Sequence, residues 1–184
     1  MNFRSVLEVD ARTSNRLRVA EQPGLLRNIS VFFAHSGDSW FWGLGLILLW
    51  VFANEPFWKK WAVVLFGGIS VLAVIVMSLK FLIRRRRPEG EWGGIYRNTD
   101  PHSFPSGHAA RAFLIAVLVL GLGPAWLAIL LCIWAPLVSL ARVLMGVHYV
   151  SDITAGMLLG IIVGWIGLQV APAFLGWLGN VIAF

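Results

Sequence analysis

Long apolar stretches separated by short polar segments run along most of the chain. The first two are Ser39–Asn54 and Trp61–Leu79. No charge occurs from Ala112 to Ala141, and a glycine-rich turn ending at Pro124 divides that stretch into two helices. The last apolar stretch is Ile153–Ala171. Because an α-helix needs about 20 apolar residues to cross a bilayer, the pattern predicts about five transmembrane helices.

The two ends of the chain have patterns of their own. Ser39–Asn54 is short for a membrane-spanning helix, so we expect the helix to include residues from Ile29–Asp38 or to be tilted in the membrane. After Pro172, we expect the last helix to end or its apolar tail to lie along the interface. Within residues 1–30, apolar positions recur at helical spacing beside arginines, which predicts a helix lying on the membrane surface. These positions are Phe3, Val6, Leu7, Ala11 and Leu17.

The composition is that of an integral membrane protein. Hydrophobic residues make up 58% of the 184 positions, charged residues 13%, and the mean hydropathy is +0.76. We expect residues 1–184 to form one all-α domain, a polytopic helix bundle with an N-terminal interfacial helix. The formal charge of +6 lies mostly on arginines near helix ends, where lipid phosphate is the expected counter-ion. No water-facing segment is long enough for a nucleic-acid-binding module, and nothing indicates an obligatory protein partner.

Outside the N-terminal segment, ionisable residues concentrate in three clusters. Their sequences are KFLIRRRRP, beginning at Lys80, PSGH, beginning at Pro105, and ARVLMGVHYVSD, beginning at Ala141. Two crossings separate the first two clusters from the third, so all three should open on the same membrane face. Because a charge near mid-bilayer costs about 2.5–3.5 kcal/mol, charges kept at the ends of apolar helices indicate a shared site. We assign the run Arg84–Arg86 to lipid headgroup anchors.

Several residues of these clusters suit a phosphoryl group. Lys80, Arg87 and Arg142 supply three cations, and the planar fork of arginine can grip two phosphate oxygens at once. Ser106 adds a hydroxyl, and Gly107 lets backbone N–H groups approach an anion at the start of a helix. Such a cage also suits phosphoryl transfer, because charge on the equatorial oxygens must be stabilised in the transition state.

Two histidines fit two different roles beside this cage. His148 precedes Asp152 by four residues, so one helical face can hold both, and the carboxylate can orient the imidazole for attack on phosphorus. No carboxylate lies near His108 in sequence, which leaves it free to protonate the departing oxygen. His35 and His102 lack ligand spacing to a partner, so we predict an enzyme without metal or other cofactor.

In these motifs the sequence resembles the type 2 phosphatidic acid phosphatase family, membrane lipid phosphatases that share their site with vanadium-dependent haloperoxidases. The motifs lie within residues 80–152: Lys80 six residues before Arg87-Pro88, the PSGH of residues 105–108, and Arg142 followed by His148 and Asp152. The resemblance implies a phosphohistidine at His148 oriented by Asp152, with His108 as general acid and later as water activator. It assigns phosphoryl binding to five residues: Lys80, Arg87, Ser106, Gly107 and Arg142.

The chain departs from the family pattern at Ala141, where a serine is usual, so a helper hydroxyl contact to phosphate is in doubt. Arg111 lies three residues beyond His108 on the same helical face. It either contacts a second phosphate or headgroup or snorkels to the interface, and we favour the second interpretation. Trp92 lies in the loop expected to face the site and is a second candidate headgroup contact.

The motifs hold phosphoryl oxygens and do not identify the lipid. We favour a polyprenyl diphosphate such as undecaprenyl diphosphate, with phosphatidylglycerol phosphate or phosphatidic acid as alternatives. A non-catalytic phospholipid-binding scaffold is the alternative of another class. The arginine distribution taken alone favours a cytoplasmic site. We nevertheless expect the site on the outer face of a bacterial or archaeal cytoplasmic membrane, because phosphate chemistry itself requires several of these cations and similar enzymes usually face outward.

Overall fold

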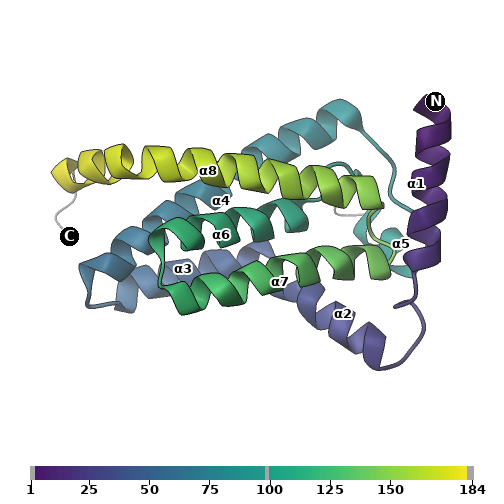
Figure 1. The fold of residues 1–184 in the computed structure, drawn as a ribbon, viewed down its shortest axis with the longest axis horizontal. Helices are drawn as coiled ribbons and strands as arrows, with labels where there is room; N and C mark the ends of the chain where they lie inside the picture. The colour runs from purple at the N-terminus through teal and green to yellow at the C-terminus, as the bar shows by residue number, and fades with distance from the viewer. Residues whose placement is uncertain (1–2, 98–99, 182–184) are drawn as a thin grey trace.

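The structure is a computed structural model that describes residues 3–97 and 100–181 (Figure 1). Its regular elements are helices, and among the described residues only Arg86 and His102 form a β-bridge. This confirms the all-α class. The helices are α1 Phe3–Leu17, α2 Leu25–Ser36, α3 Ser39–Phe52, α4 Pro56–Ile83, α5 Glu91–Arg97, α6 Gly107–Leu122, α7 Ala125–Leu144 and α8 Val150–Val181.

Five apolar helices, α3, α4, α6, α7 and α8, coincide with the predicted stretches. Of the described residues, three segments are long and apolar enough to cross a membrane: α4, α7 and Val150–Gly179 of α8. Helices α3 and α6 are apolar but shorter, with 14 and 16 residues. The turn between α6 and α7 falls at Gly123 and Pro124, as the sequence predicts.

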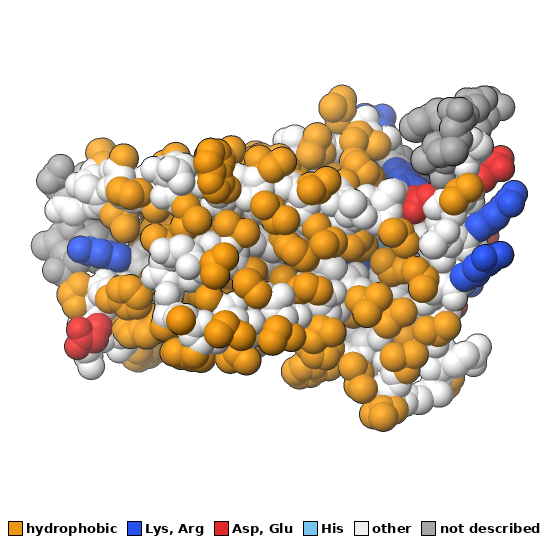
Figure 2. Space-filling view, viewed as in Figure 1, with side chains coloured by type: hydrophobic (Ala, Val, Ile, Leu, Met, Phe, Trp, Pro, Cys, Tyr) orange, Lys and Arg blue, Asp and Glu red, His pale blue; other side chains and the backbone are white. Residues whose placement is uncertain are grey.

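The outer surface of the bundle is apolar along its length. Val74 is 68% exposed and Leu158 56% exposed, although both belong to residue types that soluble domains bury. Figure 2 shows hydrophobic side chains over the middle of the visible face, with charged side chains gathered toward its two ends. A lipid-facing bundle needs this arrangement, because only its ends meet water and headgroups.

Helix α6 runs through the middle of the bundle and packs closely against α8. Gly156, Gly160 and Gly164 recur every four residues on the α8 face that meets α6. A Cβ atom at Gly156 or Gly160 would overlap the backbone of α6. This spacing of small residues lets two membrane helices approach through their backbones. The contact holds the beginnings of α6 and α8 together.

Helix α1 lies across one end of the bundle (Figure 1). The helix itself is as predicted, and it also covers the beginning of α8. The backbone N–H of Ser151 donates to Asp10 Oδ1 at 3.1 Å, and that of Val150 donates to Ser14 Oγ at 3.0 Å. Side chains of α1 therefore satisfy the first orphan donors of α8, a capping role usually filled within one segment.

At two helix ends, one of the two expected alternatives is wrong. Residues 29–38 do not extend α3, because α2 is a separate helix. Gly37 and Asp38 separate the two helices, and Asp38 has extended backbone angles. Pro172 does not end α8, which continues to Val181. Proline removes one donor and still allows an apolar membrane helix to continue.

Candidate active site

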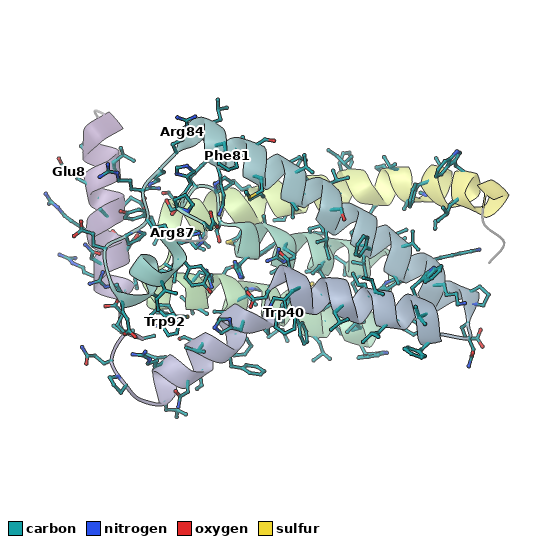
Figure 3. All side chains as sticks on the ribbon, turned by 180° about the vertical axis from the view of Figure 1, so that it is seen from behind. Glu8, Trp40, Phe81, Arg84, Arg87 and Trp92 are labelled. Carbon is teal, nitrogen blue, oxygen red and sulfur yellow. The ribbon has the colours of Figure 1, made fainter. Side chains whose placement is uncertain are left out.

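The three motifs meet at the end of the bundle that α1 covers. Lys80 lies in the last turn of α4, Arg142 in the last turn of α7, and Asp152 in the first turn of α8. Figure 3 shows Arg87 inside this end, near α1, with Arg84 and Phe81 at the neighbouring end of α4. Seven of the predicted site residues are buried: Lys80, Arg87, Ser106, Arg111, Arg142, His148 and Asp152.

Arg87 joins the first motif to the third. Its Nη1 lies 3.2 Å from His148 Nε2 and donates to the carbonyl of Val147 at 3.0 Å. Its Nη2 donates to Asp100 Oδ2 at 2.7 Å, and Lys80 Nζ contacts the same carboxylate oxygen. One carboxylate oxygen of Asp100 therefore binds both Lys80 and Arg87, and Arg87 also contacts His148 Nε2. A phosphate oxygen of a substrate could occupy the same position.

The Asp100 carboxylate is held in its ionised form. Burial alone would raise the pKa of Asp100, but the hydrogen bond to Lys80 and the charges of Lys80 and Arg87 outweigh it, and the net shift is downward. Sequence reasoning missed this residue, because Asp100 lies in the loop between α5 and α6, twenty positions from Lys80.

Arg142 is fully buried and only partly paired. Its Nη1 donates to the Tyr96 hydroxyl at 3.2 Å, and the Tyr96 ring centroid lies 4.6 Å from the guanidinium carbon of Arg142 and 5.4 Å from that of Arg87. Within the described part of the chain, Arg142 Nε and Nη2 have no hydrogen-bond partner. Buried charged donors without acceptors are costly, so this arrangement favours an anionic ligand.

His148 and Asp152 lie together but are not directly hydrogen-bonded. The distance from His148 Nδ1 to Asp152 Oδ2 is 3.6 Å, longer than a hydrogen bond, and Nδ1 has no partner among the described residues. Catalytic hydrogen bonds are often long without substrate, so the separation is compatible with the predicted pairing. Burial, with Arg87 and Arg142 nearby, lowers the pKa of His148 well below its ordinary value. The free imidazole is therefore kept neutral.

Asp152 is instead held by Arg85. Arg85 Nη1 donates to Asp152 Oδ1 at 2.7 Å, and its Nη2 donates to Asp10 Oδ2 at 2.7 Å. Its guanidinium carbon lies 4.0 Å from the centroid of the Tyr149 ring. The assignment of Arg85 to lipid headgroups is wrong, because two carboxylates draw it inward.

His108 also has a carboxylate partner that the sequence did not reveal. Its Nε2 lies 2.7 Å from Asp38 Oδ1. Arg111 is buried and donates to the carbonyl of Gly37 at 2.9 Å and to the hydroxyl of Ser39. The snorkelling interpretation of Arg111 is therefore wrong. Its guanidinium holds the loop that carries Asp38.

The remaining predicted residues lie in supporting positions. Ser106 is the N-cap of α6, where its hydroxyl accepts from Ala109 N at 3.4 Å, and its own N–H donates to the carbonyl of Asp152 at 3.0 Å. Gly107 is the first residue of α6. Trp92 packs in a hydrophobic cluster with Ala141 and lies 5.3 Å from the guanidinium of Arg27.

Ser139 does not replace the missing hydroxyl of Ala141. Its Oγ donates to the carbonyl of Ala135, on its own helix, at 2.9 Å. Ala141 itself is buried in the cluster that holds Trp92. The cage therefore lacks the helper hydroxyl of the family pattern at this position.

A cavity of about 150 Å³ joins the polar site to an apolar wall. Gly107, His108 and Arg111 line it with Lys80 and Asp100, and α4 contributes an apolar row: Ile69, Leu72, Ala73, Val76 and Met77. In the described ranges, no three His, Cys, Asp or Glu side chains are grouped so that they could hold a metal ion. The site offers cations to an anion and an apolar surface to a tail.

Residues 61–175 match the family model of the PAP2 superfamily. The match covers more than half of the 184 residues, so the chain belongs to this superfamily, and the resemblance seen in the motifs is confirmed.

Known relatives extend the similarity over most of the chain. The decaprenylphosphoryl-5-phosphoribose phosphatase of Mycobacterium tuberculosis is 32% identical over 158 residues, covering 85% of this chain and 86% of that protein. The undecaprenyl-diphosphatase of Sulfolobus acidocaldarius is 31% identical over 153 residues, covering 81% and 72%. The chain is therefore an integral membrane enzyme of the lipid phosphatase class.

Solved structures share the fold. The crystal structure of Aquifex aeolicus LpxE has a TM-score of 0.65 and 31% identity, covering 84% of this chain and 93% of that one. A PAP2-type phosphatidylglycerolphosphate phosphatase from Bacillus subtilis has a TM-score of 0.71 and covers 98% and 89%, but at 22% identity it shows the fold alone.

Proposed function

We propose that this enzyme hydrolyses the terminal phosphate of a polyprenyl-linked phosphate or diphosphate, with undecaprenyl diphosphate as the favoured substrate. The observation that carries the proposal is a buried set of cations, Lys80, Arg87 and Arg142, around the Nε2 atom of a neutral histidine, His148. Arg142 Nε and Nη2 have no acceptor among the described residues, which favours an anionic ligand, and a neutral imidazole is a nucleophile.

In the first step, His148 Nε2 attacks phosphorus. A P–N bond forms, the bond from phosphorus to the bridging oxygen of a diphosphate or to the ester oxygen of a monoester breaks, and His108 gives its proton to that departing oxygen. Asp152 accepts a hydrogen bond from the Nδ1–H of His148, and the 3.6 Å separation shortens as this bond forms. The carboxylate stabilises the positive charge on the imidazole. Lys80, Arg87 and Arg142 stabilise the charge on the transferring group.

In the second step, water replaces the lipid. His108 takes a proton from the water as its oxygen attacks phosphorus, the P–N bond breaks, and inorganic phosphate leaves with His148 restored. Substrate phosphate must first displace the Asp100 carboxylate from Lys80 and Arg87. Ser106 and Gly107 complete the cage at the start of α6, where backbone N–H groups face an anion.

The choice of lipid rests on the relatives. Two sequence relatives with broad coverage are named for polyprenyl-linked substrates, one a diphosphate and one a phosphoribose phosphate. Phosphatidylglycerol phosphate and phosphatidic acid are the alternatives. A scaffold that binds phospholipid without catalysis is the alternative of another class, and Ala141 is the departure that supports it.

We further propose a topology for the whole chain. Residues 1–184 form one domain in which α3, α4, α6, α7 and α8 cross the membrane and the 80–152 segment carries the catalytic motifs. The site then faces the outside of the cytoplasmic membrane. Glu8 is exposed on α1, so a Glu8→Cys variant in a Cys132→Ser background should react in intact cells with a membrane-impermeant maleimide. Protection from that reagent, but not from a permeant one, would place the site inside.

A substrate panel tests the proposed function. The purified protein is offered undecaprenyl diphosphate, decaprenylphosphoryl phosphoribose phosphate, phosphatidylglycerol phosphate and phosphatidic acid in EDTA, and released phosphate is measured. We expect the polyprenyl substrates to be hydrolysed fastest, without metal. Faster hydrolysis of a glycerophospholipid would overturn the substrate choice, restoration of activity by divalent ions would overturn metal independence, and no hydrolysis at all would favour the scaffold.

A further inference from the structure

Asp38 directs its carboxylate away from its own helix. It is the N-cap residue of α3, a position where aspartate usually accepts a hydrogen bond from the first turn, yet its side chain makes no capping bond. Oδ1 lies 2.7 Å from His108 Nε2 instead, and Oδ2 lies 3.1 Å from His35 Nδ1. Burial alone would raise the pKa of Asp38, but the bonds to these two histidines outweigh it and hold the pKa well below its usual range.

Two further contacts fix the loop that carries Asp38. Arg111, on the same helix as His108, binds the residues on either side, through the carbonyl of Gly37 and the hydroxyl of Ser39. Gly37 leaves no room for a side chain, because a Cβ atom there would lie 2.9 Å from Val138 Cγ1 on α7 and 3.4 Å from His108 Cδ2. The loop is thus pressed between α6 and α7, and the distance from Asp38 to His108 is set by packing.

We propose that Asp38 is the positioning residue of the general acid His108. This inference rests on the proposed function, since it assumes that His108 exchanges protons with the substrate. A bond from Nε2 to a carboxylate requires a proton on Nε2, so Nδ1 is the nitrogen that gives a proton to the lipid oxygen and later takes one from water. Asp38 thereby has the role toward His108 that Asp152 has toward His148.

A carboxylate is also needed to balance charge at this position. The guanidinium groups of Arg142 on α7 and Arg111 on α6 lie near His108. Lys80 and Asp100 line the same cavity, and His35 faces the far oxygen of Asp38. Among these groups, Asp38 is the anion in contact with His108, so it lets the ring carry a proton next to two guanidinium groups.

The test replaces charge while keeping shape. Asp38→Asn keeps an oxygen that can accept from Nε2 but removes the charge, and Asp38→Glu keeps the charge on a longer chain. Glu55→Gln is the matched control, because Glu55 is the N-cap of α4, also makes no capping bond, and is far from the site at the other end of α3. All three are compared with wild type on decaprenylphosphoryl phosphoribose phosphate, a lipid monoester whose sugar oxygen must be protonated as it leaves, and on p-nitrophenyl phosphate, whose leaving group departs without protonation.

For Asp38→Asn we expect kcat on the lipid substrate to fall by about 10²-fold with KM within threefold of wild type. With p-nitrophenyl phosphate, the burst of nitrophenol that reports phosphoenzyme formation should keep its rate within about threefold, while the later steady state slows because water activation also needs His108. Asp38→Glu should be intermediate, and Glu55→Gln should match wild type.

Three results would overturn the inference: unchanged or faster turnover of Asp38→Asn, an equal loss in the burst and on the lipid substrate, or a rise in KM alone. An equal loss in both Asp38 variants, accompanied by a lower melting temperature, would make the role structural. Failure of the proposed function is a separate observation, because wild type itself would then release neither nitrophenol in a burst nor phosphate from the lipid.

Discussion

Replacing Arg142 by methionine should remove activity while leaving the protein slightly more stable. The guanidinium is fully buried, and its Nε and Nη2 find no acceptor among the described residues. An unpaired buried donor costs about 1–3 kcal/mol, and the bond to the Tyr96 hydroxyl, which the variant loses, is worth about 1.5–3 kcal/mol. The substitution removes two unpaired donors and loses one hydrogen bond, so the free energy of unfolding should rise by an amount on the order of 1 kcal/mol. That rise corresponds to an increase of about 2–4 °C in Tm. The variant should lose about 10³-fold in kcat, because one cation of the transition state is gone.

The assay is thermal unfolding followed by tryptophan fluorescence, with and without orthovanadate, beside phosphate release. Vanadate at 100 times its Kd should stabilise wild type by about 2.7 kcal/mol, hence raise its Tm by roughly 5–10 °C, and should shift the variant far less. The matched control is Arg86→Met, because Arg86 is an exposed arginine of the same face. A Tm that falls by several degrees, with activity retained, would show that Arg142 is a structural residue and would refute the reasoning.

Three further predictions follow from charges at the site. Asp100→Asn should lower the Ki of orthovanadate by about tenfold, because the carboxylate that competes for Lys80 is removed; a higher Ki would show that Asp100 supports ligand binding instead. Arg85→Met leaves the fully buried carboxylate of Asp152 with the backbone N–H of Tyr149 but without its arginine partner, so we expect a loss of about 3–5 kcal/mol in stability and a lower kcat; an unchanged Tm in thermal unfolding would contradict this. Since the pKa of His148 is lowered, the imidazole stays neutral as the pH falls through 6.5, and the acid limb of kcat/KM, corrected for substrate ionisation, should lie below about pH 6.5; a limb at or above that value would contradict the account.

Hydropathy and short motifs were enough to predict the helix windows and to name residues that the fold brings together at one end of the bundle. The apolar stretches are long and almost free of charge, so in a bilayer they have few alternatives to an α-helix. Helices α4, α6, α7 and α8 lie where they were expected. Motif residues at helix ends were also predictable, because a charge at the edge of an apolar helix needs a reason to remain there. Gly156, Gly160 and Gly164 carried an unused signal, since small residues four apart predict a close helix contact.

The acidic partners of the site could not be read from the sequence. Asp38 and His108 are 70 residues apart, and Asp10 and Arg85 are 75 apart, so each pair exists only after the helices pack. Periodicity in a sequence shows which residues share one face of a single helix, whereas these contacts join segments that are far apart in the chain at one end of the bundle. Asp100 is nearer to Lys80 in sequence, but no periodicity links the loop between α5 and α6 to the end of α4.

The proposed mechanism requires a covalent bond between phosphorus and His148. The decisive measurement is acid-free trapping of the enzyme after brief exposure to undecaprenyl diphosphate labelled with ³²P in its terminal phosphate, followed by peptide mapping of the label. We predict label on the peptide that contains His148, stable in alkali and lost in acid, and no label on a His148→Asn variant that still folds and binds vanadate. Label of equal amount on that variant, or alkali-labile label on another residue, would contradict the central claim.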